Sequence, residues 1–260
     1  MKRIAYLAIT LFSSAAISMA QSPEQKGLDI AQKADEVDHG FESSSSTLTM
    51  ILKNKHGQES TRKLSNQTLE LVEDGDKSMI VFNSPRDVKG TATLTYTHKE
   101  GADDQWLYLP ALKRVKRISS NNKSGPFMGS EFAYEDLSSQ EVEKYTYKFL
   151  KEESLNGEAC YAVERDPVDP NSGYSRQIAW YNKGNYRIEK IEYYDRKNAL
   201  LKTLTFKNYQ QYLNKHWRAG EMVMVNHQSN KETTLIFDDY QFKLGLTDND
   251  FTQNSLKRSR

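Results

Sequence analysis

The sequence predicts a mainly β protein in which a long antiparallel sheet curls around one dry face. Apolar residues recur at every second position from about residue 43 onward, and Thr91 to Thr97 is the clearest run, with Leu94 and Tyr96 between threonines. Two-residue turn signals, Asp74-Gly75 and Asn156-Gly157, have the composition whose positive φ angles suit hairpins. Many alternating strands joined by short turns form an antiparallel meander, and a sheet of that length must curl.

One helix is expected before the first strand. Ser22 can cap it, Pro23 suits the first helical position, Gln25 completes a capping box, and Gly40 marks the end. We expect its apolar face to lie inside the curl of the sheet. That face consists of residues three positions apart: Leu28, Ala31, Ala34 and Val37.

The rest of the chain supplies the strands and two shorter helical pieces. Helical turns are expected around 134–142 and 247–254, with Asp248 as a cap for the second. No internal repeat or linker divides the chain, so residues 21–260 are expected to form a single domain. The strand-like runs lie at 47–53, 67–72, 78–83, 91–97, 105–109, 145–149, 160–165, 176–182, 187–194, 201–207, 221–228, 232–238 and 240–244.

The first twenty residues have the pattern of a cleavable signal peptide. Lys2 and Arg3 precede a short apolar run, and Ser18-Met19-Ala20 fits the small-x-small cleavage rule. Gln21 follows in place of a lipid-accepting cysteine, and no later run approaches the roughly eighteen apolar residues of a membrane span. We therefore predict an exported, periplasmic protein without a stable membrane anchor.

Composition argues against several classes of function. Lys and Arg total 36 against 35 Asp and Glu, and this balance is a poor match for nucleic-acid binding. The single cysteine, Cys160, has no disulfide partner within the chain and lies in an apolar run typical of a buried strand. The five histidines lack metal-site spacing, and no phosphate-binding or dinucleotide motif is present. Neither a cofactor nor a metal is expected.

Trp106 to Leu137 is the most distinctive segment. An aromatic strand leads into the basic run Lys113 to Ile118, and a Gly/Ser loop then precedes Phe127-Met128-Gly129-Ser130-Glu131-Phe132. One interpretation is structural: a hairpin with a basic edge that discourages aggregation, followed by a buried connection. The other is functional: a cavity mouth whose basic side chains, Lys113, Arg114, Lys116 and Arg117, meet a partner or anionic head groups.

Trp106 to Ile118, Phe127 to Phe132 and Tyr134-Glu135-Asp136-Leu137 together resemble the LolA-like family of outer membrane lipoprotein-sorting proteins. Residues 85–91 and 246–252 are similar to the family in the same way. The resemblance implies a half-open, incomplete β-barrel closed by helices, with a hydrophobic cavity for acyl chains. It also implies a periplasmic setting, often beside permeases of the resistance-nodulation-division type. Lipoprotein cargo and a free lipid both remain open.

A carrier of this kind has a clear physical purpose. Exposing a sixteen-carbon acyl chain to water costs on the order of 12 kcal/mol, so unassisted passage through an aqueous compartment is slow. The residues that we expect to line the cavity, each of which could equally be core, are Leu94, Tyr96, Trp106, Tyr108, Phe127, Met128, Phe132, Tyr145, Tyr147, Phe149, Trp180, Met222 and Met224.

Two other classes of function remain as alternatives. A protein-binding accessory or envelope sensor, working with an inner-membrane permease, would use the same fold with its cavity collapsed or filled by side chains. A periplasmic hydrolase would need an acid, a base and a nucleophile in one cleft. Ser130 is a weak candidate for that nucleophile, because Gly129-Ser130-Glu131 lacks the second glycine of a nucleophile elbow. The carrier is the function we predict, and we expect no enzymatic activity.

Overall fold

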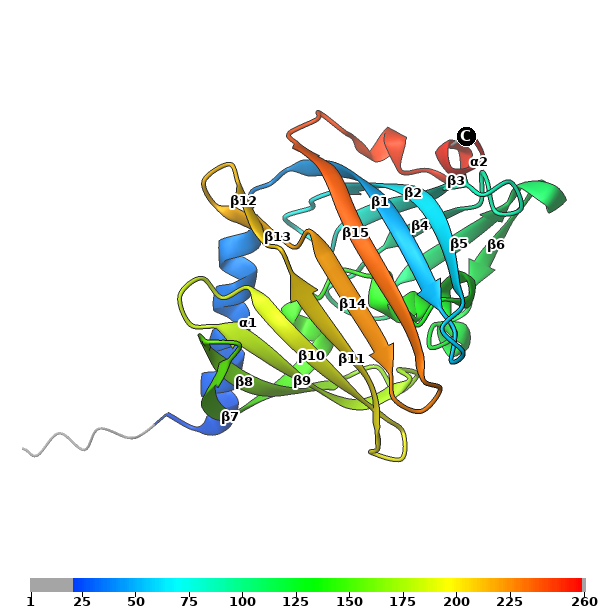
Figure 1. Cartoon of the computed structure of the whole chain (residues 1–260). Coiled ribbons are helices and arrows are strands. Elements are labelled where there is room, and N and C mark those ends of the chain that lie inside the picture. The colour runs from blue at the N-terminus through cyan, green and yellow to red at the C-terminus, as the bar shows by residue number, and fades with distance from the viewer. Residues whose placement is uncertain (1–20, 259–260) are drawn as a thin grey trace, which may run out of the picture.

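The computed structural model describes residues 21–258, so the predicted signal peptide lies outside the described residues. A single antiparallel sheet of 13 strands dominates the molecule (Figure 1), in the order β6-β5-β4-β3-β2-β1-β15-β14-β11-β10-β9-β8-β7. The strands are β1 (Ser43–Lys53), β2 (Glu59–Leu69), β3 (Lys77–Ser84), β4 (Ala92–Tyr96), β5 (Asp104–Leu109), β6 (Arg114–Ile118), β7 (Tyr145–Leu155), β8 (Glu158–Pro167), β9 (Tyr174–Asn182), β10 (Ile188–Asp195), β11 (Leu200–Lys207), β14 (Glu221–Asn226) and β15 (Lys231–Phe242).

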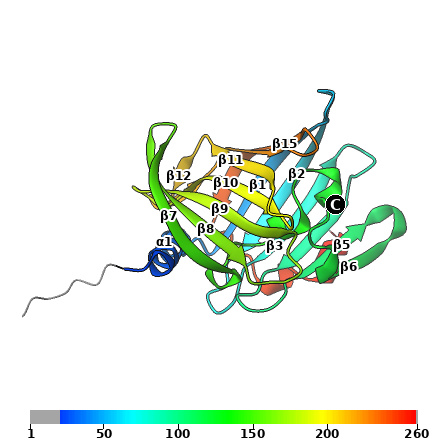
Figure 2. The same cartoon turned by 90° about the horizontal axis from the view of Figure 1, so that it is seen from below.

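The sheet curls into a trough and does not close into a barrel, as Figure 2 shows from one end. β6 and β7 are its two edges, because each pairs with only one neighbour in the described chain. The predicted fold class, a curved antiparallel sheet forming an incomplete barrel, is therefore confirmed. A separate two-stranded ribbon, β12 (Gln210–Tyr212) and β13 (His216–Arg218), projects between β11 and β14.

The element boundaries follow local chemistry. In the turn between β7 and β8, Asn156 and Gly157 both have positive φ angles, 53° and 89°, as predicted for a two-residue hairpin. Asp74-Gly75 instead lies in the longer connection between β2 and β3. The two runs predicted at 232–238 and 240–244 form the single strand β15, which shifts register near its end and remains paired with β1.

Helix α1 (Pro23–Asp38) lies along the edge strand β7 (Figure 2). Ser22 caps it by accepting a hydrogen bond from the amide of Gln25, as predicted. Ile30 and Ala31 belong to the main core, so the apolar face of the helix packs against the inside of the sheet. The approach to β7 is close because Gly27 has no side chain.

The connection between the two edge strands, residues 119–144, folds back into the trough. It contains one isolated β-bridge, between Pro126 and Ala133, and four short 3₁₀ turns: η2 (Ser120–Asn122), η3 (Phe127–Gly129), η4 (Tyr134–Leu137) and η5 (Val142–Lys144). Phe127 and Phe132 are buried in the main core, and Arg62 on β2 donates to the carbonyl oxygen of Met128 at 2.6 Å. On the other side, the hydroxyl of Thr233 on β15 accepts from the amide of Glu131 at 3.0 Å. The connection therefore fills much of the interior.

The C-terminal segment covers the opposite face of β4. Its short elements are η6 (Asp248–Asp250) and α2 (Gln253–Arg258), and Thr247, not Asp248 as predicted, caps the first turn. Phe251 and Leu256 are fully buried in a second cluster with Leu94. Thr93 and Thr95 of β4 point the other way and are buried, and Thr97, directly after the strand, accepts a hydrogen bond from the amide of Ser139 in the interior connection. Both faces of this strand are covered, where the sequence predicts one dry face.

Candidate functional site

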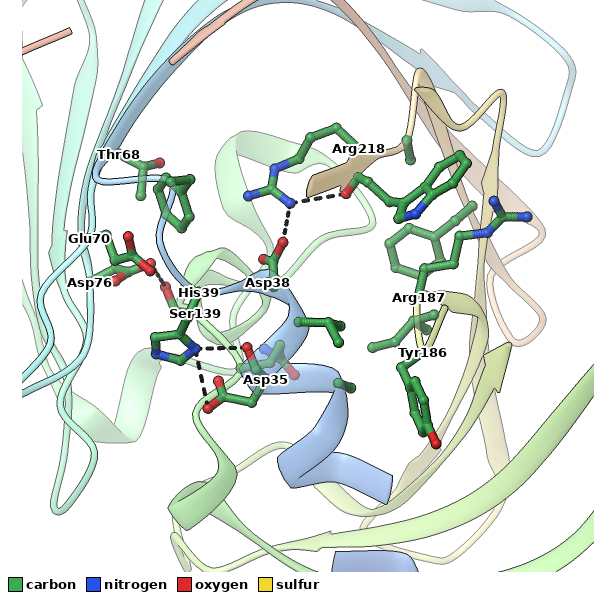
Figure 3. Close-up of a pocket in the computed structure, with 18 of the residues that line it drawn as sticks. Asp35, Asp38, His39, Thr68, Glu70, Asp76, Ser139, Tyr186, Arg187 and Arg218 are labelled. Carbon is green, nitrogen blue, oxygen red and sulfur yellow. Dashed lines mark hydrogen bonds and ion pairs between the residues drawn. The ribbon is translucent and has the colours of Figure 1, made fainter. Parts of the chain in front are cut away.

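A cavity of about 470 Å³ lies inside the trough at the end where α1 finishes (Figure 3). Its walls come from the C-terminal half of α1, the ends of β1 and β2, residues 139–142, the turn after β9 and the ribbon β12–β13. Its volume lies in the range typical of small-molecule pockets. Apolar side chains alternate with charged ones around it, so the site suits a molecule with both kinds of surface.

Acidic groups gather on one wall (Figure 3). Asp76 accepts from the hydroxyl of Ser139 at 3.2 Å, and His39 donates from Nδ1 to the backbone oxygen of Asp35 at 2.7 Å. Burial raises the pKa of Asp76 to about 6. Burial, and then the charges of Asp76 and Asp35, raise the pKa of Glu141 to about 7. These carboxyl groups therefore titrate close to neutral pH.

Basic and aromatic groups form the facing wall (Figure 3). Arg218 pairs with Asp38 at the end of α1 and lies 5.2 Å from the ring centre of Phe41. Arg187 pairs with Glu189 at 2.7 Å and lies 5.0 Å from the ring centre of Trp217. The ion pair with Asp38 fixes the ribbon β12–β13 to α1, so this wall has a defined shape.

The third part of the lining comes from β7, β8 and β9. Arg165 on β8 is 2% exposed, and its Nε donates to Oε1 of Gln177 at 2.8 Å. Its guanidinium carbon lies 4.8 Å from the ring centre of Tyr145. Tyr147 and Tyr181 also line the cavity here, and the hydroxyl of Tyr147 donates to the backbone oxygen of Val142 at 3.0 Å. This places a buried positive charge beside the cavity.

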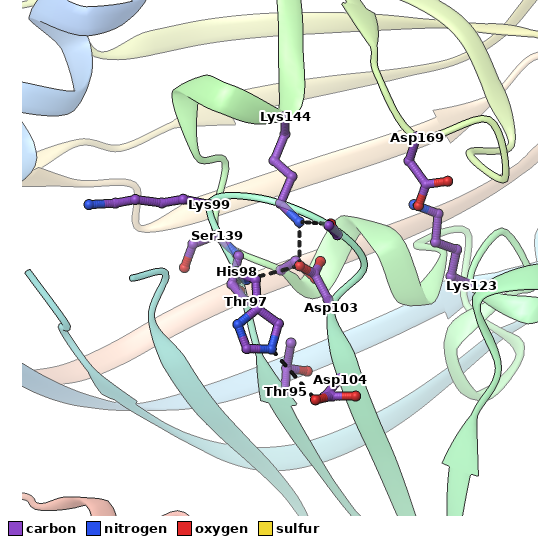
Figure 4. A network of polar contacts seen from close by, with 12 residues as sticks. Thr95, Thr97, His98, Lys99, Asp103, Asp104, Lys123, Ser139, Lys144 and Asp169 are labelled. Carbon is purple, nitrogen blue, oxygen red and sulfur yellow. Dashed lines mark hydrogen bonds and ion pairs between the residues drawn. The ribbon is translucent and has the colours of Figure 1, made fainter. Parts of the chain in front are cut away.

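The loops next to the cavity are held by a second polar network (Figure 4). Lys144 pairs with Asp103 at 2.6 Å, and His98 bonds to Asp74 at 2.7 Å through Nδ1. The hydrogen bond from His98, followed by that from the amide of Lys99, lowers the pKa of Asp74 to about 2. This network ties residues 74–104 to Lys144, directly before β7, and the amide of Ser139, a residue of the cavity lining, donates to Thr97 in the same segment.

The structure distributes the predicted cavity residues among several places. Tyr147 and Met222 line the cavity. Other members pack in the main core around it and are not part of its lining: Phe127, Met128, Phe132, Tyr145, Phe149 and Met224.

The remaining predicted residues lie on the outer face of the sheet. Trp180 packs with Cys160, while its neighbour Tyr181 points inward, because successive side chains of a strand face opposite ways. Four aromatic and apolar residues lie beneath the C-terminal segment: Leu94, Tyr96, Trp106 and Tyr108. Alternation alone shows which residues share a face of the sheet but not which face is inside. Here the apolar face of β4 lies outside the trough, where the C-terminal segment covers it.

The predicted basic contact residues lie on the edge strand β6 and the turn before it. Lys113, Arg114, Lys116 and Arg117 are all exposed, and Arg117 pairs with Asp104 on β5. The adjoining Leu112 is 67% exposed at the tip of the hairpin. This tip is separate from the cavity lining.

The sequence prediction missed the charged lining, above all Arg165. One signal was available: Arg165 is two residues from Val163 and four from Tyr161, so it lies in phase with their inward face. Within residues 21–258, no group of three or more His, Cys, Asp or Glu side chains could hold a metal ion. In that same span, no helix is long and apolar enough to cross a membrane.

The chain is similar to a family model and to several proteins of known structure. A family model described as a "-like: Uncharacterized protein" matches residues 74–258. The structure is similar to that of an outer membrane lipoprotein-sorting protein domain from Vibrio parahaemolyticus, with 57% identity over 90% of this chain and all of that one, at a TM-score of 0.89. The chain belongs to the LolA-like family. The predicted family resemblance is thus confirmed.

Two more solved structures extend the likeness of this LolA-like protein. A DUF1329 family protein from Desulfovibrio piger is 31% identical over 91% of this chain and all of its own, with a TM-score of 0.85. A LolA superfamily protein from Nitrosomonas europaea, 22% identical over 91% of this chain and all of its own, shares the fold at a TM-score of 0.72. A comparison with curated proteins gives no match.

Proposed function

We propose that this LolA-like protein is a non-enzymatic periplasmic carrier that holds a lipid, lipoprotein acyl chains or another hydrophobic molecule in its cavity. The observation that carries the proposal is the cavity of about 470 Å³ inside the curved sheet. It is supported by the 57% identity to a domain named for outer membrane lipoprotein sorting. The signal-peptide pattern of residues 1–20 supports export to the periplasm.

The lining explains how one protein both binds and protects such a cargo. Ile188, Phe206, Met222 and Phe237 offer apolar surface to a chain, and removing that chain from water is favourable by about 0.8 kcal/mol per methylene. α1 and the ribbon β12–β13 enclose this end of the trough, and the ion pair between Asp38 and Arg218 joins them. Release then requires that this enclosure open.

The second candidate is a protein-binding accessory of an inner-membrane permease of the resistance-nodulation-division type. The observation in its favour is that residues 119–144 already occupy much of the trough. In either function, the tip of the β5–β6 hairpin, with exposed Leu112 beside Lys113 and Arg114, is the surface that we assign to contact with a membrane or a partner.

Native mass spectrometry of the protein purified from the periplasm, followed by lipid extraction, tests the carrier proposal. We expect near-stoichiometric acyl-chain species with the wild type and their loss in Met222→Trp, which fills the cavity. Val223→Trp is the matched control, because that neighbouring side chain faces away from the cavity. A wild-type protein that is empty and takes up no fluorescent fatty-acid probe would favour the accessory.

A further inference from the structure

Arg165 is a buried cation for which the described part of the protein supplies no anion. It is among the largest fully buried side chains, and its Nη2 has no hydrogen-bond partner. The arginines that form ion pairs within residues 21–258 are Arg117, Arg176, Arg187 and Arg218. The contacts of Arg165 are instead neutral: the side-chain amide of Gln177 and the ring of Tyr145.

Such an arrangement is costly. A guanidinium does not lose its proton in a protein, so Arg165 remains charged, and an unpaired charge in the interior loses the hydration it would have in water. Lys202, which is also buried, is by contrast paired with Asp136 at 2.7 Å. Acidic side chains line the same cavity, but within residues 21–258 none of them, Glu141 included, forms an ion pair with Arg165; Asp38 pairs with Arg218, and Asp76 accepts from Ser139. An anion from outside the chain would meet this unpaired charge.

We propose that the cavity binds an amphipathic molecule with a single anionic head, a carboxylate or phosphate, and that Nη2 of Arg165 donates to that head. Arg165 lines the cavity, and guanidinium groups bind both oxyanions through charge-assisted hydrogen bonds. The chain of the ligand then lies against the apolar residues Ile188, Phe206 and Met222. The inference rests on the proposed carrier function and narrows its cargo. Because ester- and amide-linked acyl chains carry no charge at the linkage, it favours a free acidic lipid over a lipoprotein.

Titration calorimetry of the delipidated protein with four probes tests this assignment: palmitate, hexadecyl phosphate, 1-hexadecanol and inorganic phosphate. The variants are Arg165→Met and, as a matched control, Arg176→Met. Arg176 lies on the adjacent strand and pairs with Glu164 on the outer face. We expect Arg165→Met to weaken binding of the two anionic amphipaths by about 10- to 100-fold, the range of a hydrogen bond to a charged group. Binding of 1-hexadecanol should not change, and Arg176→Met should bind all probes as the wild type does.

The outcomes separate the anchor from the carrier. If Arg165→Met weakens the binding of 1-hexadecanol as strongly as that of palmitate, the head-group anchor is wrong while the carrier stands. The same conclusion follows if the variant weakens the binding of neither probe. If the wild type binds none of the three amphipaths, the carrier proposal itself fails. If inorganic phosphate alone binds as tightly as palmitate, the site is one for a small anion and the lipid assignment is overturned. Replacing an unpaired buried charge by an apolar side chain is expected to preserve or raise the melting temperature of the empty protein, which checks folding.

Discussion

Lys202 and Asp136 form an ion pair of 2.7 Å in which both side chains are only 5% exposed. Asp136 also accepts from the hydroxyl of Tyr174 at 2.8 Å and from the amide of Ala133 at 2.6 Å. Lys202 donates to the backbone oxygen of Glu131 at 3.0 Å. A single pair thereby holds the interior connection to β9 and β11, two strands of the wall.

Breaking this pair from one side should be costly. In Lys202→Met, the carboxylate of Asp136 stays buried without its cation, and the free energy of unfolding should fall by about 3–5 kcal/mol. The double variant Lys202→Met/Asp136→Asn should recover part of that loss, because no unpaired charge remains. Urea denaturation of the wild type, the single variants Lys202→Met and Asp136→Asn, and the double variant measures this; strictly additive losses would show that the two side chains do not stabilise each other.

Glu141 makes stability depend on pH in an unusual direction. Burial raises its pKa from the ordinary 4.5 to about 7, so the folded protein holds this proton more tightly than the unfolded chain does. Its contribution to stability is therefore full below about pH 4.5 and is lost as the pH rises toward 7. Glu141→Gln should remove this decline and be more stable than the wild type at pH 7.5, by on the order of 2–3 kcal/mol.

Denaturant unfolding at several pH values between 4.5 and 7.5 provides the measurement. Glu143→Gln is the control, since Glu143 lies two residues away with an exposed side chain. A stability difference between Glu141→Gln and the wild type that is the same at pH 4.5 and 7.5 would show that this carboxyl is not the titrating group.

Residue-scale prediction from the sequence worked where a residue's surroundings are set by its own strand. Tyr147 is expected in the cavity because it alternates with Thr146 and Lys148, and Met222 because a flexible side chain suits varied ligands; both line the cavity. Arg165 follows the same alternation but was not predicted, because charged residues are expected outside. Leu94 is the reverse case: it is buried as predicted for an apolar face, but it packs against Phe251, far along the chain.

At the scale of elements, α1 was predicted with its start and its apolar face, but not its position beside β7. That position depends on Gly27, since a Cβ there would lie 2.7 Å from the amide nitrogen of Phe149. A glycine within a helix usually weakens it, so the sequence alone gives no reason for this residue. Close packing against the edge strand supplies the reason.

Gly27→Ala should therefore destabilise the protein even though alanine favours helix by about 1 kcal/mol. The new methyl group meets backbone atoms of Lys148 and Phe149, which cannot rotate away, and we expect a net loss of about 1–3 kcal/mol. Thermal unfolding compares this variant with Glu24→Ala, an exposed position in the first turn. A raised melting temperature for Gly27→Ala would mean that α1 can shift away from β7 at no cost.

The C-terminal segment stabilises the molecule through a few contacts. Phe251 is fully buried against the outer face of β4, and the hydroxyl of Tyr96 donates to its backbone oxygen. Phe251→Ala should lower the free energy of unfolding by about 3–5 kcal/mol, as for other buried aromatic truncations. Limited proteolysis should then cut first near residue 245. The exposed Asn254→Ala is the control, and equal proteolysis of both variants would contradict the covering role of Phe251.

For the whole molecule, the curl of the sheet was predictable because so many antiparallel strands with a common dry side must bend around something. The segment that fills the trough was not predictable, because residues 119–144 have almost no regular structure and are held in place by single polar side chains. Gln105, for example, holds this connection by donating to the backbone oxygen of Tyr134 at 2.8 Å. The number and charge of such contacts decide how much cavity remains, and they arise only when the two halves of the sheet meet.

The β5–β6 hairpin, which we propose as the contact surface for a membrane or a partner, lies at the edge of the sheet farthest from β7 in pairing order. Its exposed cations should attract anionic lipid head groups at about 1 kcal/mol each, and exposed Leu112 can enter the interface. The triple variant Lys113→Glu/Arg114→Glu/Lys116→Glu should therefore lose over about 100-fold in affinity for vesicles containing anionic lipid, measured by flotation at low salt. Raising the salt concentration should lower the affinity of the wild type for these vesicles toward that of the variant.

A control with the same charge change, Lys148→Glu/Lys151→Glu/Lys197→Glu, alters exposed sites outside the hairpin. If both triples lose binding equally, net charge governs the attraction and the hairpin is not the contact surface.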